Sequence, residues 1–370
     1  MTQKTSLIEK ESHTAIHIEW IDFLKVIATL LVIIGHCTYY NIQSPYGGIN
    51  LLEYSCERSL TSKLINYLIG FIYTFHMPLF MAISGMCFFL SLQKREQSFS
   101  YLVKSKWKRL LIPFLGVSTF YSIPLKWLSG YWDNSVNTLH DMLLGQLFLL
   151  GNTHLWYVFS LFWIFIIFYF IEFFNLFKHK WIWGLLLLLS WLGRYMEASG
   201  MGFLGFAPAM EHLLYFSVGF YVFNWINNNE VRSVHFYLSS LAGLFIFYLI
   251  FVKCQPLFPQ ATSAAKYPVI TLLALLGGSN IIGLSKRLSK KMRSYKFITL
   301  LKNNTYELYL YSDPLNYVLI ACLPYFVSGC FLESNATSIF LFLIRFIFTT
   351  AGALLVSLLL KKIFKRKQMI

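Results

Sequence analysis

Charged residues are scarce in this chain of 370 residues. Asp, Glu, Lys and Arg make up only 13% of it, whereas 57% of the residues are hydrophobic and the mean hydropathy is +0.58. An ordinary soluble domain carries about 25% charged residues. The composition therefore excludes such a domain and predicts a polytopic membrane protein.

Cysteine is also rare. The six cysteines form no CxxC pair and show no metal-ligand spacing, which argues against a structural metal site. We therefore predict no metal centre. Cys56, Cys254 and Cys330 fall in predicted outer loops, where thiols can oxidise, and the sequence leaves open whether any two of them pair.

The chain has no internal repeat, heptad array or low-complexity tract. We predict a single membrane domain over 1–370, with a polar cytoplasmic N-terminus (1–19), a helical bundle (20–360) and a basic cytoplasmic tail (361–370). The first 19 residues lack the features of a cleavable signal peptide, so we expect the first span to be retained as an anchor. Any active site is then expected among the helices or their short loops.

Long apolar runs predict the fold. A helix needs roughly 20 residues to cross the hydrocarbon layer of a bilayer, and about ten apolar runs approach that length. This predicts an all-α bundle of about ten transmembrane helices. The runs are 20–40, 65–92, 110–128, 155–177, 181–193, 211–226, 236–252, 267–284, 304–325 and 337–360.

The basic residues predict the orientation. If the N-terminus is cytoplasmic, most of the 31 Lys and Arg residues fall on cytoplasmic segments, as the positive-inside bias requires. An even number of spans then returns the basic C-terminal tail to the cytoplasm. The net charge of +15 is thus spread along one membrane face. It predicts contact with anionic lipid headgroups or an anionic cytoplasmic substrate, and not with nucleic acid.

The first span carries three groups that a bilayer normally excludes, namely Asp22, Lys25 and His36. At 100° per residue, His36 lies about 40° from the direction of Asp22, so the three groups share one stripe. Ionisable groups inside membrane segments usually serve function and face the bundle interior. The alternatives are an Asp22–Lys25 pair that only marks the membrane boundary and a His36 that only packs.

His36 lies about 21 Å along the helix from Asp22, so a catalytic dyad with His36 needs a residue from another helix. The second span offers His76 within FHMPLFMAISG (75–85). There Pro78 interrupts the helical hydrogen bonds, and Ser84 with Gly85 permits close packing or a cavity wall. A kink needed only for packing is the alternative.

Basic residues precede the third span in KWKRLLIP (106–113). Lys106, Lys108 and Arg109 could bind the phosphates of a cytoplasmic donor, and the guanidinium of Arg109 suits a phosphate best. The alternative is that they only follow the positive-inside bias.

The other titratable or polar candidates for lining a site lie far apart in the sequence. His154 and Trp156, in HLWYV (154–158), could equally be interfacial anchors. Asp313 and Arg345 could simply form a buried ion pair. With Ser84, the set of candidates is His154, Trp156, Glu211, Asp313 and Arg345.

Four motifs in order give the chain a family resemblance. IDFLKVIATLLVIIGH (21–36), FHMPLFMAISG, KWKRLLIP and HLWYV resemble the membrane acyltransferase-3 family of integral, acyl-CoA-dependent O-acyltransferases. The family's basic residue, which precedes the histidine with ten residues between them, is often Arg where this chain has Lys25. Its frequent histidine in the ninth span is replaced by Ser312, and its optional fused extracytoplasmic domain has no counterpart.

The resemblance implies a chemistry and a location. It implies transfer of an acyl group, with acetyl expected, from acyl-CoA as co-substrate to a hydroxyl of a surface polysaccharide or lipid-linked sugar, at the plasma membrane of a bacterium. No tightly bound cofactor is expected. His36 would act as base or acyl acceptor, assisted by Asp22, Lys25 and His76, with the donor on the basic rim. This mechanism requires His36 to line a crevice that opens to that rim.

Two other functions are compatible with the same residues. An intramembrane Asp, Lys and His stripe also suits a secondary transporter or exporter, although no repeated halves are detectable. The departures at Lys25 and Ser312 also leave open an inactive member that organises a glycan-assembly complex.

Overall fold

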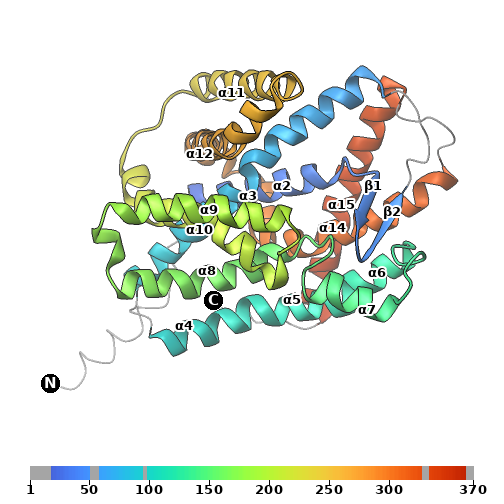
Figure 1. The fold of residues 1–370 in the computed structure, drawn as a ribbon, viewed down its shortest axis with the longest axis horizontal. Helices are drawn as coiled ribbons and strands as arrows, with labels where there is room; N and C mark the ends of the chain where they lie inside the picture. Colours follow the sequence, from blue (N-terminus) through green and yellow to red (C-terminus); the bar gives the residue numbers. More distant parts are fainter. Residues whose placement is uncertain (1–17, 51–57, 95–97, 327–332, 364–370) are drawn as a thin grey trace.

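The computed structural model describes residues 18–50, 58–94, 98–326 and 333–363. These residues are almost entirely helical, which confirms the predicted α-helical membrane fold (Figure 1). The exception is a two-stranded antiparallel hairpin of β1 (Asn41–Ser44) and β2 (Gly47–Asn50). Cys254 is a free thiol. Cys56, Cys330 and most of both terminal segments lie outside the described residues, so the predictions on them stay open.

Each predicted apolar run coincides with a long helix. The helices are α2 (Glu19–His36), α3 (Leu60–Lys94), α8 (Trp156–Phe173), α9 (Trp181–Ala198), α10 (Phe206–Asn228), α11 (Val234–Cys254), α12 (Pro259–Met292), α14 (Thr305–Cys322), α15 (Asn335–Ile363), and a continuous stretch, Phe99–Leu128, built from α4 (Phe99–Lys106), α5 (Ile112–Val117) and α6 (Ile123–Leu128) joined by π-helical turns. Two short helices, α7 (Thr138–Met142) and α13 (Lys296–Lys302), connect them.

Within the described residues, six of these helices are long and apolar enough to cross a membrane by length and composition. The other four are α2, α9, α10 and α14. A helix enclosed by other helices needs no apolar surface on every side, and α10 accordingly buries polar residues such as Glu211 and His212. By contrast, Tyr237 is the one buried residue of α11, which lies at the edge of the bundle. The number of crossings and the cytoplasmic location of both termini stay predictions.

The helices α3 and α10 approach each other through glycines. A Cβ atom added at Gly85 would lie 2.1 Å from the carbonyl oxygen of Phe216, and one added at Gly219 would lie 2.0 Å from that of Ala82. Only glycine allows such backbone contact between membrane helices. Ser84, which precedes Gly85 on α3, contacts the start of α8 through a hydrogen bond of 2.7 Å between its hydroxyl and that of Tyr157.

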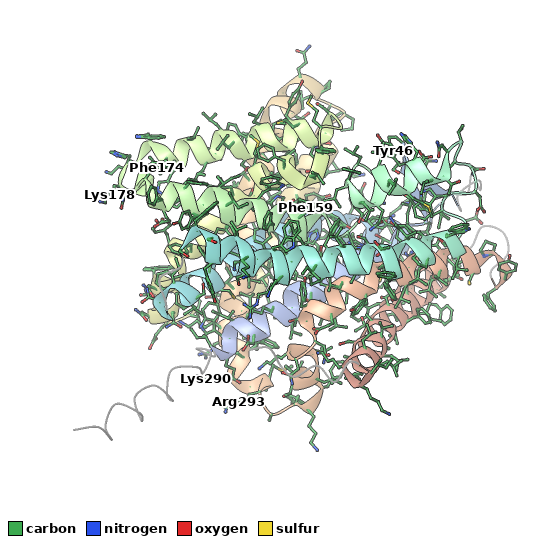
Figure 2. All side chains as sticks on the ribbon, turned by 90° about the horizontal axis from the view of Figure 1, so that it is seen from below. Tyr46, Phe159, Phe174, Lys178, Lys290 and Arg293 are labelled. Carbon is green, nitrogen blue, oxygen red and sulfur yellow. The ribbon has the colours of Figure 1, made fainter. Side chains whose placement is uncertain are left out.

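Residues predicted on one membrane side also share one end of the molecule. Figure 2 shows Lys178, Lys290 and Arg293, from segments predicted to be cytoplasmic, toward one end, and Tyr46, from a predicted outer loop, toward the other. The helices α8 and α9 and the stretch Phe99–Leu128 run in roughly the same direction, whereas α15 lies at a steep angle to them (Figure 1).

Candidate active site

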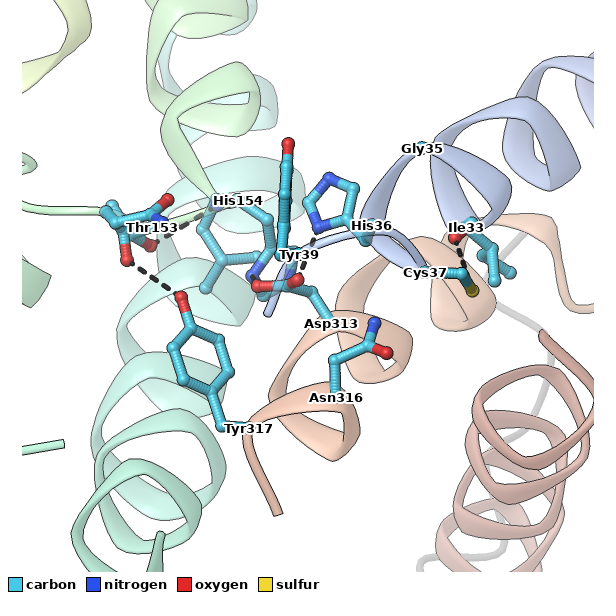
Figure 3. A network of polar contacts seen from close by, with 12 residues as sticks. Ile33, Gly35, His36, Cys37, Tyr39, Thr153, His154, Asp313, Asn316 and Tyr317 are labelled. Carbon is cyan, nitrogen blue, oxygen red and sulfur yellow. Dashed lines mark hydrogen bonds and ion pairs between the residues drawn. The ribbon is translucent and has the colours of Figure 1, made fainter. Parts of the chain in front are cut away.

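His36 is the last residue of α2, and its partner comes from a helix near the other end of the chain. Its Nδ1 hydrogen-bonds to Oδ1 of Asp313, on α14 (Figure 3). The two side chains are 14% and 7% exposed. The side chain from another helix that bonds to His36 is thus Asp313, not His76, and a catalytic role for the pair stays a prediction.

His154 contacts the second oxygen of the same carboxylate. Its Nδ1 lies 3.2 Å from Oδ2 of Asp313, and its Nε2 lies 3.1 Å from the carbonyl oxygen of Leu310. The hydroxyl of Tyr309 donates to the backbone oxygen of His154. Asp313 thus lies between two imidazoles, so each histidine limits the movement of the carboxylate that orients the other (Figure 3).

The second ring nitrogen of His36, Nε2, is the atom of this site that can act as a base or a nucleophile. Asp313 fixes the ring through Nδ1, and among the described residues no group bonds to Nε2. When the proton is on Nδ1, Nε2 carries an available lone pair. An imidazole held in this way can remove a proton from a hydroxyl or attack a carbonyl, and the carboxylate stabilises the resulting imidazolium.

Arg345 holds the backbone that carries His36. It is fully buried on α15, and its guanidinium donates to the carbonyl oxygens of Tyr39 (2.7 Å) and His36 (3.0 Å) and to Oδ1 of Asn316 (3.3 Å). A cation at the carbonyl end of a helix is favourable. The suggested direct Asp313–Arg345 pair is wrong, because Asp313 bonds to the two histidines while Arg345 bonds to backbone and Asn316.

His76 lies close to the site without touching His36. It is buried on α3, its Nδ1 is 3.1 Å from the carbonyl oxygen of Ile72, and its ring packs edge-on against Tyr73 at 4.6 Å. The Tyr73 hydroxyl meets that of Tyr39, whose ring is 5.5 Å from the ring of His36. The contacts that link His76 to His36 thus run through Tyr73 and Tyr39.

A cavity of about 310 Å³ lies beside this site. It is lined by parts of α2, α3, α8, α14 and the stretch that begins with α4. Three basic residues face it, Lys25, Lys106 and Arg109, and Arg109 is exposed, so the cavity is basic where it approaches the surface. The expectation that the first span and the basic rim line one cavity agrees with this geometry.

The inner wall of the cavity is mainly apolar. Lys106 Nζ lies 3.6 Å from the centroid of the Phe165 ring, so its charge rests against an aromatic face. Nζ of Lys25 lies 3.0 Å from Oδ1 of Asp22. These two residues of the predicted polar stripe on α2 therefore form an ion pair beside the cavity. Ser84 lines the cavity, whereas Lys108 is exposed and is not among the lining residues.

His36 itself does not line this cavity. Thr29 is the α2 residue that reaches furthest toward it, seven positions or about 10 Å along the helix. This cavity alone therefore does not form the predicted continuous crevice from the basic rim to His36, and the aromatic rings of Phe80, Tyr157 and Tyr309 line it.

Two predicted site-lining residues belong elsewhere. The Trp156 ring faces His212 at 5.3 Å, and Glu211 pairs with Arg194. They mark a polar cluster between α8, α9 and α10, separate from the contacts of His36. Among the described residues, no three His, Cys, Asp or Glu side chains are arranged to hold a metal ion.

Several site residues were not anticipated, namely Thr29, Tyr39, Tyr157, Tyr309 and Asn316. Helical spacing could have indicated two of them, because Thr29 follows Lys25 by one turn and Tyr309 precedes Asp313 by one turn. Tyr157 is part of the HLWYV motif, whose residues the sequence predicts to be interfacial anchors as much as site residues. The roles of Tyr39 and Asn316 depend on tertiary contacts that no local pattern encodes.

A family model matches most of the chain. No curated protein and no solved structure matches the chain. A family model described as an acyltransferase domain, that of acyltransferase family 3, matches residues 18–362. It spans every long helix and all the residues of the site above, from Asp22 to Arg345. The chain therefore belongs to the acyltransferase-3 family and is a membrane acyltransferase.

Proposed function

We propose that this protein transfers an acyl group, acetyl in the first instance, from acyl-CoA to a hydroxyl of a surface polysaccharide or lipid-linked sugar. The observation that carries the proposal is the Asp313-bound His36, with a free Nε2, next to a basic cavity. The family accounts for acyl transfer. The donor, the acetyl group, the acceptor and the bacterial plasma membrane are parts of the proposal.

The donor would bind in the cavity from the cytoplasm. Its phosphates are anionic, and Lys25, Lys106 and Arg109 supply cations at the exposed end. The apolar walls suit the narrow pantetheine arm, which would carry the thioester toward α2 and α14. Lys108, being exposed on the same turn, could contribute only long-range attraction.

The reaction then needs two proton transfers, one to His36 and one from it, and the exchange of a C–S bond for a C–O bond. His36 Nε2 takes the proton of the acceptor hydroxyl, and the oxygen attacks the thioester carbonyl. The tetrahedral intermediate expels the CoA thiolate, which takes the proton back from the imidazolium. Asp313 stabilises that imidazolium through Nδ1 and keeps the ring in the tautomer that leaves Nε2 free.

The two other functions have less support. A transporter would use the same ionisable residues, but family membership favours acyl transfer. A protein that only organises a complex does not require the contacts of the Asp313 carboxylate with His36 and His154. Lys25, despite replacing the frequent Arg, still lines the cavity.

The test uses membrane vesicles that contain the protein, labelled acetyl-CoA on the cytoplasmic side and the host's glycolipids as acceptors. We expect His36→Ala to lower transfer by about 100-fold or more, because a positioned base contributes roughly that factor. Asp313→Asn should lower it by at least about tenfold, since the tautomer is no longer fixed.

A matched control exists in His140→Ala. His140 also contacts an aspartate, Asp141 at 3.0 Å, but its side chain is 55% exposed and it does not line the cavity. Its replacement should leave transfer unchanged. Equal transfer by wild type and His36→Ala, at equal protein levels, would contradict the proposed function.

A further inference from the structure

The cavity ends one helical turn from the site on three helices. On each of α3, α8 and α14, the lining residue nearest to the site precedes or follows a site residue by three or four positions. The pairs are Phe80 with His76, Tyr157 with His154, and Tyr309 with Asp313. Only one layer of side chains therefore separates the donor cavity from the imidazoles.

That layer is made of three aromatic rings. The ring of Phe80 lies 5.4 Å from that of Tyr157 and 6.1 Å from that of Tyr309, and the two tyrosine rings are 5.4 Å apart. Each ring contacts the other two, so together they close the cavity toward His36. A thioester bound in the cavity must displace at least one of them to react.

Phe80 is the ring that can move at the lowest cost. The hydroxyl of Tyr157 is hydrogen-bonded to Ser84 at 2.7 Å, and the hydroxyl of Tyr309 donates to the backbone of His154. Phe80 has no polar atom to anchor its side chain. It also follows Pro78 by two residues, and proline leaves a gap in the helical hydrogen bonds of α3.

We propose that Phe80 is a specificity-determining residue, which limits the size of the acyl group that can pass from the cavity to His36. The inference rests on the proposed function, because it assumes a thioester that travels in this direction. The two anchored tyrosines form the fixed sides of the passage, and the side chain of Phe80 forms the movable one. A small acetyl group needs only a limited displacement of that ring, whereas a longer chain needs a wider opening.

The experiment compares acetyl-CoA, butyryl-CoA and octanoyl-CoA as donors in the vesicle assay. We expect wild type to prefer acetyl-CoA. Phe80→Ala and the milder Phe80→Leu should raise the kcat/KM for octanoyl-CoA relative to acetyl-CoA by at least about tenfold, since even a few methylenes change selectivity by that much. Phe80→Trp should lower transfer from every donor, with the larger loss for the longer chains.

Phe89→Ala is the matched control. Phe89 lies on the same helix and packs against Phe220 and Phe223, outside the cavity, so its loss should change stability without changing the donor profile. Thermal unfolding in detergent identifies any variant that does not fold, and Phe80→Leu then replaces Phe80→Ala. An unchanged donor profile in folded Phe80 variants of an active enzyme overturns this inference alone. No transfer by wild type from any donor overturns the proposed function as well.

Discussion

Thr29 lies on the wall of the proposed donor cavity, and its buried hydroxyl has no hydrogen-bond partner among the described residues. It is 1% exposed, and its Oγ1 has no hydrogen bond within the described part of the chain. A hydroxyl in this state costs free energy unless a ligand bonds to it. We predict that Thr29→Val raises the KM for acetyl-CoA by roughly 2- to 10-fold, the value of one hydrogen bond, and leaves the free energy of unfolding equal or higher.

Thr350→Val is the control for this effect. Thr350 is also buried with an unpartnered hydroxyl, but it does not line the cavity. The same substitution there should leave the KM unchanged. Steady-state kinetics at varied donor concentration measures both variants, and an equal KM in wild type and Thr29→Val would show that the hydroxyl does not contact the donor.

The site also shows how far single residues can be assigned from the sequence. His36 could be identified because a titratable group in an apolar run is costly wherever it lies. Its partner could not, since Asp313 is 277 positions away and nothing local distinguishes a carboxylate that meets a histidine from one that meets an arginine. Arg345 illustrates the same limit, because besides Asn316 its partners are the backbone carbonyls of Tyr39 and His36, which have no sequence signature.

At the scale of elements, the contact between α3 and α10 should be sensitive to added atoms. Gly85→Ala would place a methyl group 2.1 Å from the carbonyl oxygen of Phe216, so the two helices must separate. We predict a loss of stability of about 1–3 kcal/mol or more, as for other overpacked interiors. Thermal unfolding in detergent should show a lower Tm, and transfer should fall because Ser84 and the cavity wall shift with α3.

Gly243→Ala provides the comparison. Gly243 lies in the middle of α11, and an added Cβ there has no atom within 4 Å. Alanine favours a helix over glycine, so the Tm should stay equal or rise slightly. A Gly85→Ala protein as stable as wild type would mean that α3 and α10 do not pack as closely as described.

The elements themselves were largely predictable from hydrophobic length. Each of the ten apolar runs lies in a long helix. A helix of about 20 residues spans the hydrocarbon layer, and few other backbone structures satisfy their hydrogen bonds there. What the sequence could not show is which helices are enclosed. The short apolar run at 211–226 belongs to α10, which has 23 residues and packs against α3, α8 and α9, and only this packing explains the polar groups it carries.

At the scale of the whole molecule, the proposed donor cavity can bind its donor only if the protein has one particular orientation in the membrane. Lys25, Lys106 and Arg109 line it, and the proposed acyl-CoA donor would be supplied from the cytoplasm. The positive-inside bias places the same end in the cytoplasm. Charge bias and donor access therefore demand the same orientation, so a measured topology tests both.

We predict that a cysteine at position 136 reacts with a membrane-impermeant maleimide in intact cells, whereas a cysteine at position 290 reacts only after the membrane is opened. Val136 is fully exposed in the predicted outer loop, and Lys290 is exposed near the end of α12. Both cysteines are introduced into a variant without native cysteines, whose transfer activity is checked first. Labelling of position 290 alone in intact cells would place the basic end of the cavity outside, where no acyl-CoA reaches it.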